Sequence, residues 1–212
     1  MNRGSSTRLL EGAAALGVQL DGEQVRQLLA YVETLSKWSS TWNLTGIRDP
    51  EDMLSRHLLD SLSAAPFLAG RSVVDVGTGA GLPGVPLAIA DPARQFVLID
   101  ANGKKIRFVT HVIGQLGIGN ARTEQIRVEH YRPAQGFDTV LCRAFSALAK
   151  LLHSAGHLCA PGGRVIAMKG ARPQAEIEAL PDGWRAVAAH RVRVPGLGRE
   201  RHIVEIARVS GC

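Results

Sequence analysis

The sequence predicts an α/β protein with a Rossmann-like, mostly parallel seven-stranded sheet, a helical N-terminal extension and an antiparallel hairpin strand at the end. Three observations predict it. Only helical periodicity occurs before residue 70, short β-branched runs then alternate with helical stretches, and the glycine cluster Gly77–Gly81 follows the first of these runs. Such alternation is typical of a parallel sheet covered on both faces. We therefore expect a helical extension that lids a pocket over residues 1–69 and a Rossmann-like domain over 70–212.

The extension begins with two predicted helices. Residues 1–6 are small and polar, so we expect them to be frayed, with a short helix ending at Gly17. Asp21 and Gln24 have the spacing of a capping box, which starts a helix of about five turns. Its apolar stripe continues to Trp38 and Trp42 at helical intervals, so we expect both tryptophans to pack in the core.

A third helix should begin at Asp49, with Pro50 in its first turn, and end at Pro66. Strands are expected over residues 72–76, 95–99, 121–126, 137–142 and 164–169. Helices are expected over residues 85–90, 104–116, 147–159 and 174–180. The β-rich segments 186–194 and 201–209 are joined by Pro-Gly-Leu-Gly, which indicates a hairpin whose last strand runs antiparallel to the others.

Composition and charge narrow the class of protein. The chain has 212 residues, 45% of them apolar, as in ordinary globular proteins, and its formal net charge is +6. Residues 107–212 hold this excess, with fifteen basic and eight acidic side chains, which favours a polyanionic partner. The three cysteines are far apart, so we expect no disulfide framework and no metal site. No apolar stretch is long enough to span a bilayer, and we expect a monomeric cytoplasmic protein.

The glycine cluster indicates a nucleotide-like cofactor. It stands in the segment Asp75-Val-Gly77-Thr-Gly79-Ala-Gly81, where the third glycine of a dinucleotide motif would fall on Leu82. This spacing favours S-adenosylmethionine over NAD, although an NAD-dependent oxidoreductase stays as an alternative. Asp100 closes the second strand, where a carboxylate binds ribose hydroxyls in either class of enzyme. A plain strand-to-helix turn with Asp100 as a helix cap is the remaining alternative.

If the enzyme transfers a methyl group, the absence of certain motifs limits which atom can accept it. Carbon-5 methylation of pyrimidines needs a cysteine nucleophile, commonly after proline, and neither Cys142 nor Cys159 follows proline. Exocyclic amines are usually methylated next to a Pro-Pro pair, and the chain has none. Guanine N7 carries a free lone pair and needs no general base, so positioning would supply most of the rate. Arg143, at the end of the fourth strand, is the candidate for such positioning. A methyltransferase for another RNA or a small molecule, and a non-catalytic RNA-binding protein, stay open.

With these residues in place, the sequence resembles the small-subunit ribosomal RNA methyltransferase G family, also called glucose-inhibited division protein B. The resemblance extends from Leu28 to Ile206, with Ser39, Ser40 and Cys142 as small departures. Its segments are Lys37-Trp38 with Asn43-Leu44-Thr45, Arg56 to Ser61, Asp75 to Leu87, Gly103-Lys104-Lys105, Arg127-Val128-Glu129, Arg143-Ala144-Phe145, Lys169-Gly170 and Glu200-Arg201-His202.

The resemblance implies a class I S-adenosylmethionine methyltransferase that methylates N7 of a guanine in 16S ribosomal RNA, free or within a 30S particle or an assembly intermediate. The cofactor contacts that the motif and the resemblance together assign are Asp75, Gly77, Gly79, Gly81, Leu82, Asp100, Val128, Glu129 and Arg143.

Basic side chains near the predicted pocket and in the terminal hairpin are the candidates for RNA contact. They are Arg56, Lys104, Lys105, Lys169, Arg199, Arg201 and His202. His57, beside Arg56, is a weaker candidate, because a satisfied buried histidine is at least as common.

Overall fold

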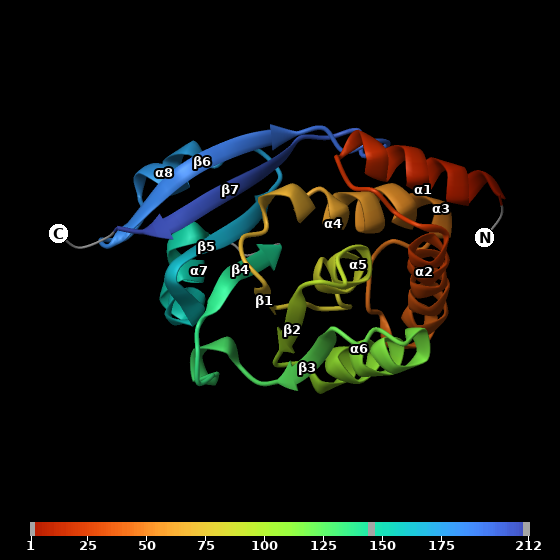
Figure 1. Ribbon diagram of the computed structural model, residues 1–212, viewed down its shortest axis with the longest axis horizontal. Coiled ribbons are helices and arrows are strands. Elements are labelled where there is room, and N and C mark those ends of the chain that lie inside the picture. The colour runs from red at the N-terminus through yellow and green to blue at the C-terminus, as the bar shows by residue number, and fades with distance from the viewer. Residues whose placement is uncertain (1–2, 144–146, 210–212) are drawn as a thin grey trace.

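A computed structural model describes residues 3–143 and 147–209. Its centre is a seven-stranded sheet in the order β3-β2-β1-β4-β5-β7-β6 (Figure 1). β7 pairs antiparallel with both β5 and β6, and the other pairs are parallel. The predicted sheet and its antiparallel last strand are thus confirmed. The strands are β1 (Ser72–Val76), β2 (Gln95–Asp100), β3 (Ala121–Gln125), β4 (Phe137–Arg143), β5 (Cys159–Lys169), β6 (Trp184–Val192) and β7 (Arg201–Arg208).

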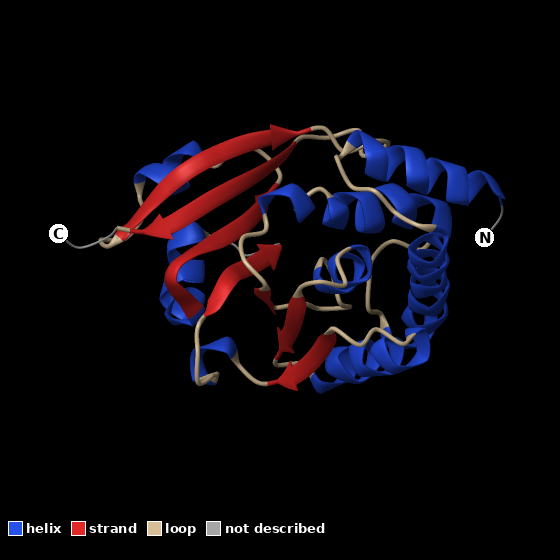
Figure 2. Cartoon of the chain, in the orientation of Figure 1, coloured by secondary structure: helices blue, strands red, loops and turns tan. Residues whose placement is uncertain are grey.

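Helices cover both faces of the sheet (Figure 2). Successive residues of a strand point to opposite faces, and β1 divides its side chains accordingly. Val73 packs against the N-terminal helices with α5 (Gly84–Ala90) and α6 (Gly103–Leu116). Val74 packs against α7 (Leu148–Ala155) and the short helix η4 (Gly156–Leu158) on the opposite face. The remaining short helices are η3 (Val128–His130) and α8 (Gln174–Glu178).

The first two helices pack on the same face as α5 and α6. Helix α1 (Arg3–Ala15) already includes residues that we expected to be frayed. Ser5 is 1% exposed and donates a hydrogen bond to Glu51 at 2.7 Å, so the expectation of fraying is wrong from residue 3 onward. Helix α2 (Gly22–Trp42) starts at the predicted capping box of Asp21 and Gln24. No helix in the described parts of the chain is long and apolar enough to cross a membrane.

The two tryptophans of α2 have different surroundings. The ring of Trp38 is half-buried and lies 5.4 Å from the ring of Phe108, as core packing requires. Trp42, one turn later, is 36% exposed. The expectation that both tryptophans belong to the core is therefore wrong for Trp42, because the apolar stripe of α2 extends past the neighbouring core.

The third predicted helix is divided into several parts. It begins as α3 (Pro50–Met53) with Asp49 as its cap and Pro50 in its first turn, both as predicted. It then widens into a π-helical turn, η1 (Leu54–Leu59), and continues as α4 (Asp60–Leu62) and η2 (Ala65–Phe67). Periodicity alone does not predict a π-turn, which is rare and often occurs at functional sites.

A carboxylate joins the amino ends of β1 and β4. One oxygen of Asp138 accepts hydrogen bonds from the backbone N–H groups of Arg71 and Ser72, at 2.8 and 2.9 Å, and from the Ser72 hydroxyl at 2.9 Å. These donors favour the charged form, so they hold the pKa of Asp138 below its usual value. Gly70 has φ +60°, and a Cβ there would lie 2.3 Å from the Asp138 side chain. The segment before β1 therefore needs glycine.

We expect Asp138→Ala to lower the free energy of unfolding by about 2 kcal/mol at pH 7, because it removes three hydrogen bonds to a charged acceptor. A carboxyl with a lowered folded-state pKa stabilises above its unfolded-state pKa and loses this effect as the pH falls. The difference from wild type should therefore shrink toward pH 3. Urea unfolding at both pH values measures it, with the exposed Asp182→Ala as the control. Equal effects of the two variants would contradict the assigned role.

Candidate functional site

The carboxyl ends of β1, β2 and β3 meet at a cavity of about 230 Å³. It lies at the edge of the sheet where ligands bind in parallel α/β folds, and the strand order reverses beside it at β1 and β4. Four predicted cofactor residues line it together: Gly77, Asp100, Val128 and Glu129. Their joint position follows from the register, since Val76, the last residue of β1, pairs with Ile99, and β2 ends one residue later at Asp100.

The glycine loop, residues 77–81, has a backbone that only glycine adopts easily. Gly77, Gly79 and Gly81 have φ values of 70°, 61° and 91°. At Gly81 a Cβ would lie 2.6 Å from Cγ2 of Val85, so a side chain is excluded there by packing as well. Gly79 donates its backbone N–H to Oδ2 of Asp100 at 3.0 Å, which fixes the loop to the end of β2.

Asp75 lies beneath this loop and is completely buried. Its Oδ2 accepts hydrogen bonds from the Thr78 hydroxyl at 2.6 Å and the backbone N–H of Gly84 at 2.9 Å, whereas its Oδ1 has no partner. Burial raises the pKa of Asp75 to about 6, against the opposing effect of the two hydrogen bonds. Asp75 therefore fixes the loop to α5, and Leu82, 5% exposed, is packed in the core behind the loop.

Tyr31 of α2 also reaches the glycine loop. The ring is fully buried and its hydroxyl donates a hydrogen bond to the carbonyl of Ala80 at 2.8 Å. Burial raises the pKa of Tyr31, so the hydroxyl stays protonated and remains a donor. This contact could not be predicted from the sequence, because a tyrosine within an apolar helical stripe is indistinguishable from an ordinary core residue.

A buried ion-pair cluster joins the N-terminal helices to the ends of β4 and β7. Asp60 of α4 is 1% exposed, and Arg201 binds both its oxygens, at 2.5 and 2.8 Å. Arg143, the predicted positioning residue, donates to Oδ2 of the same carboxylate at 3.2 Å and is 18% exposed. Sequence reasoning missed this role of Asp60, although a carboxylate among leucines in Leu58-Leu59-Asp60-Ser61-Leu62 was a signal for a buried ion pair.

His57 lies close to this cluster as a neutral side chain. Burial and the charge of Arg143 lower the pKa of His57 to about 4. Its Nδ1 lies 3.1 Å from the carbonyl of Arg56 and can only donate there, so its Nε2 accepts from the Thr45 hydroxyl at 2.7 Å. His57 is therefore the satisfied buried histidine of the alternative interpretation, and it adds no positive charge at neutral pH.

The predicted RNA contacts divide into two groups. Lys104 and Arg199 are exposed, whereas Arg56 and Lys105 are half-buried, and the Nζ of Lys105 lies 3.9 Å from Asp100. The other three are largely buried, so they offer little surface to RNA, and their contact with RNA stays a prediction. Arg201 is bound to Asp60, Lys169 is bound to Glu176 at 2.8 Å, and His202 is 4% exposed.

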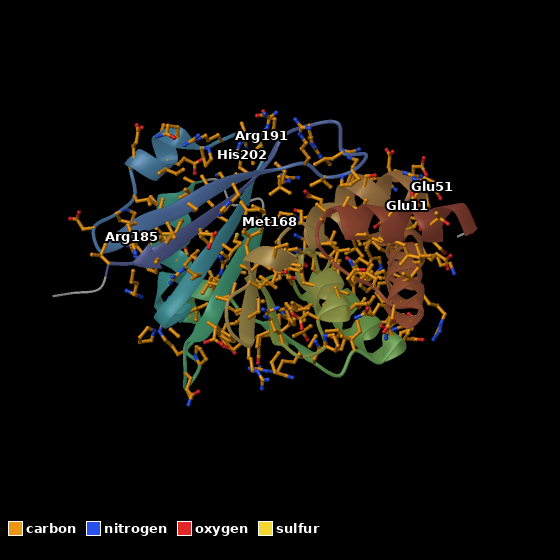
Figure 3. All side chains as sticks on the ribbon, turned by 45° about the horizontal axis from the view of Figure 1, so that its top comes forward. Glu11, Glu51, Met168, Arg185, Arg191 and His202 are labelled. Atoms are coloured by element: carbon orange, nitrogen blue, oxygen red, sulfur yellow. The ribbon has the colours of Figure 1, made fainter. Side chains whose placement is uncertain are left out.

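The terminal hairpin nevertheless carries exposed cations. Arg191 pairs across the strands with His202, and Figure 3 shows the two residues near the same end of the hairpin. Arg191 forms an exposed ion pair with Glu200 at 2.8 Å, whereas His202 faces inward with its Nδ1 3.1 Å from the carbonyl of Gly170. The two consecutive β7 residues Arg201 and His202 are thus both held inside, on Asp60 and on the carbonyl of Gly170.

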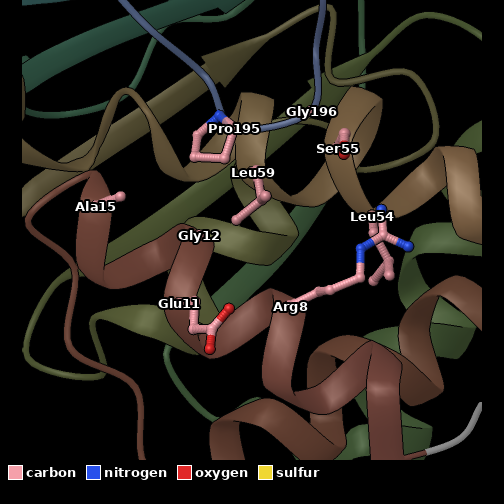
Figure 4. A pocket seen from close by; sticks show the side chains of 9 residues that line it. All are labelled: Arg8, Glu11, Gly12, Ala15, Leu54, Ser55, Leu59, Pro195 and Gly196. Carbon is pink, nitrogen blue, oxygen red and sulfur yellow. The ribbon is translucent and has the colours of Figure 1, made fainter.

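Another cavity, of about 250 Å³, is lined by residues of α1, η1 and the hairpin loop, including Arg8, Ser55 and Gly196 (Figure 4). None of the residues lining it is a predicted site residue, so we assign the site to the glycine loop. Within residues 3–143 and 147–209, no three His, Cys, Asp or Glu side chains gather as metal ligands would. The predicted segment Ala144–Phe145 lies outside the described residues.

This architecture is that of class I S-adenosylmethionine methyltransferases. Solved structures with the same fold include an S-adenosylmethionine-dependent methyltransferase from Aquifex aeolicus, with a TM-score of 0.57 and 19% identity over 76% of this chain and 94% of that one. A 16S rRNA (adenine(1408)-N(1))-methyltransferase from Catenulisporales acidiphilia has a TM-score of 0.55 and 19% identity, over 73% of this chain and 92% of that one.

The family is defined by sequence. The family model of rRNA small subunit methyltransferase G, GidB, matches residues 24–204. The ribosomal RNA small subunit methyltransferase G of Methylococcus capsulatus is 50% identical over 93% of this chain and 96% of its own length. That of Stutzerimonas stutzeri is 47% identical over 95% of each. The chain therefore belongs to the rRNA small subunit methyltransferase G family, and the expected resemblance is confirmed.

We expect Asp60→Ala to lower the free energy of unfolding by about 3 to 5 kcal/mol, because it leaves two buried guanidinium groups without a counter-charge. Asp52→Ala is the matched control, since Asp52 forms only an exposed pair with Arg56 at 3.7 Å and should cost less than about 1 kcal/mol. Urea unfolding of both variants measures the difference. A loss below about 1 kcal/mol for Asp60→Ala would show that the cluster is not a structural link.

The buried Asp75 gives a pH dependence of the opposite sign to that of Asp138. Its folded-state pKa is raised to about 6, so its protonated form stabilises at low pH, and this effect is lost as the pH rises from about 4 to 6. Relative to Asp75→Asn, which cannot titrate, wild type should lose about 1 kcal/mol per pH unit in this range. Urea unfolding from pH 4 to 7 tests it. Parallel curves for the two proteins would mean that Asp75 titrates normally.

Proposed function

We propose that this protein transfers a methyl group from S-adenosylmethionine to N7 of a guanine in 16S ribosomal RNA. The observation that carries the proposal is the cavity where Gly77, Asp100 and Glu129 meet, in a chain of the rRNA small subunit methyltransferase G family. We further propose that the enzyme acts as a cytoplasmic monomer on free 16S RNA or on a small-subunit particle, with residues 1–69 as a helical extension on the methyltransferase domain.

The residues of the cavity fit S-adenosylmethionine. The glycine loop presents backbone without side chains, so the methionine portion can lie against it. Asp100 is fixed by hydrogen bonds from the backbone N–H groups of Gly79 and Asn102, and its carboxylate lines the cavity where it can accept from both ribose hydroxyls. Val128 offers an apolar wall and a backbone N–H to the adenine, with Glu129 beside it.

Asp75 fits an ammonium group in this arrangement. Its Oδ1 is buried and has no hydrogen-bond partner in the described structure, and a buried polar atom of this kind usually has one. A bound cationic amine nearby would favour the charged carboxylate and lower the raised pKa of Asp75. The methionine portion carries such an ammonium group.

The chemistry needs alignment more than acid–base catalysis. When bound, S-adenosylmethionine supplies a methyl group on a positively charged sulfur, and guanine N7 can accept it through an in-plane lone pair without losing a proton. The role left to this chain is to hold the two reactants in line. Arg143 is suited to this role because Asp60 fixes its guanidinium group and it retains exposed surface at the end of β4.

The electrostatic balance of the site is consistent with that role. N7-methylguanine is positively charged, so unpaired cations near it would oppose its formation. Asp60 neutralises part of the charge of Arg143 and Arg201, and His57 is neutral at physiological pH because its pKa is about 4. The phosphates of the RNA would instead bind other cations that are exposed or half-buried, among which we propose Arg56, Lys104, Lys105 and Arg199.

Methyl transfer to RNA tests the proposal directly. We expect the purified protein with isotopically labelled S-adenosylmethionine to convert one guanine of unmodified 16S RNA, or of 30S particles, to N7-methylguanine. Nuclease digestion and mass spectrometry locate the product. Labelling of another base, or only of a non-16S RNA, would favour a different RNA substrate, and no labelling of any RNA would overturn the proposal.

We expect Asp100→Ala to weaken binding of S-adenosylmethionine at least tenfold, since it removes hydrogen bonds from a charged acceptor to the ribose. Calorimetry measures the Kd, and circular dichroism checks that the variant is folded. Asp182→Ala, an exposed acid outside the cavity, should bind as wild type does. Unchanged affinity in Asp100→Ala would remove Asp100 from the cofactor site.

A further inference from the structure

The surface between α2 and α6 carries a row of side chains with planar groups: two indoles, a guanidinium group and an imidazole. Two pairs, each spaced four residues apart on its helix, face each other: Trp38 and Trp42 on α2, and Arg107 and His111 on α6. The guanidinium group of Arg107 lies over the ring of Trp42, 5.5 Å from its centroid. Trp38 stacks on His111 with 4.9 Å between the ring centroids and touches Trp42 edge-on at 4.7 Å.

This row is anchored in the core and open at its outer end. Trp38 packs on Phe108, which is completely buried, so the inner part is fixed. Arg107 and His111 are exposed, and Trp42 is the only exposed tryptophan, tyrosine or phenylalanine among the large hydrophobic residues of the described chain. An exposed indole that neither core packing nor the cofactor cavity explains is a candidate for ligand contact.

The charges around the row select an anionic partner. Helix α6 carries Lys104, Lys105, Arg107 and His111 and no acidic residue along its whole length. The last nine residues of α2, from 34 to 42, include Lys37 and likewise no acidic residue. In Figure 1 these two helices meet at the lower right of the molecule. Aromatic and guanidinium planes surrounded by cations are what proteins use to bind unpaired nucleotides.

The row is also close to the cofactor cavity. Helix α6 starts three residues after Asp100, which lines the cavity, and Arg107 donates from Nε to the carbonyl of Gly103 at 3.3 Å. Lys104 is exposed on the first turn of α6, three residues before Arg107. A nucleotide strand that leaves the cavity along this turn would meet a cation for its phosphate first and then the stacked planes.

We propose that Trp42 and Arg107 form a stacking platform for an unpaired base of the RNA substrate, flanking the nucleotide that enters the cavity. The inference rests on the proposed RNA-methylating function and adds to it the surface that holds the neighbouring strand. Trp42 and Arg107 are binding residues in this role and take no part in methyl transfer.

The test separates stacking from charge. We expect Trp42→Ala to raise the Kd for 16S RNA, and for a short unstructured oligoadenylate, roughly tenfold or more. Trp42→Phe should restore most of the affinity. For an abasic oligomer of the same length and charge, wild type and Trp42→Ala should bind equally. Arg107→Gln should weaken binding to oligoadenylate and lower the salt slope by about 0.7. The Kd for S-adenosylmethionine should not change in any of these variants.

The other tryptophan–arginine pair of the chain provides a matched control. Arg208 lies over Trp184 at 4.6 Å, on β7 and β6 at the far edge of the sheet. Trp184→Phe should bind RNA as wild type does. A Kd within twofold of wild type in Trp42→Ala, or an equal loss for the abasic oligomer, would overturn the platform.

Activity separates this inference from the proposed function. In Trp42→Ala we expect a higher KM for 16S RNA with kcat unchanged at saturation. If wild type methylates 16S RNA and the variant matches it in both Kd and KM, the platform is wrong and the function stands. If wild type methylates no RNA but oligoadenylate binding still depends on Trp42, the function is wrong and the RNA-binding surface stands.

Discussion

The fold depends most on one buried carboxylate, that of Asp60. It holds Arg201 at the start of β7 and Arg143 at the end of β4, so a single side chain fixes the N-terminal helices against two strands. Breaking such a buried ion pair costs more than the pair contributes over an apolar alternative, because the remaining charges have no water to solvate them. The N-terminal helical segment is thus bound by ion pairs to the carboxyl end of the parallel strands, in addition to its packing against the face of the sheet.

The same carboxylate sets the electrostatics of the site. Arg143 affects the pKa of His57, Asp75 and Tyr31, so its position influences groups on three different elements. Two arginines on one aspartate leave a modest positive excess deep in the protein, close to a cavity proposed for a cationic cofactor. The unpartnered oxygen of Asp75 is the local negative group that we propose for the ammonium group of such a ligand. In that proposal a few buried charges serve both stability and binding.

Sequence patterns predicted the features of the fold that depend on residues close together in the chain. The glycine loop, the capping box of α2 and the mostly parallel sheet with its antiparallel last strand all follow from spacing and periodicity, and the cavity unites Gly77 with Asp100 and Glu129 because parallel strands end together. The predictions were wrong where contacts between distant parts of the sequence decide whether a side chain is buried. Burial of Arg201 depends on an aspartate 141 residues away, and exposure of Trp42 depends on where the neighbouring core ends. Charge counting cannot distinguish a cation on the surface from one that neutralises a buried acid.

The sequence separation within the Asp60 cluster affects how the chain folds during synthesis. Its two arginines lie 83 and 141 residues after it, so α4 leaves the ribosome long before either partner exists. Until β4 is made, Asp60 has neither of its partners, and the cluster stays incomplete until β7 is made. Contacts of such long range slow folding and expose intermediates to aggregation. The last strand to be synthesised is therefore the one that completes the first helices.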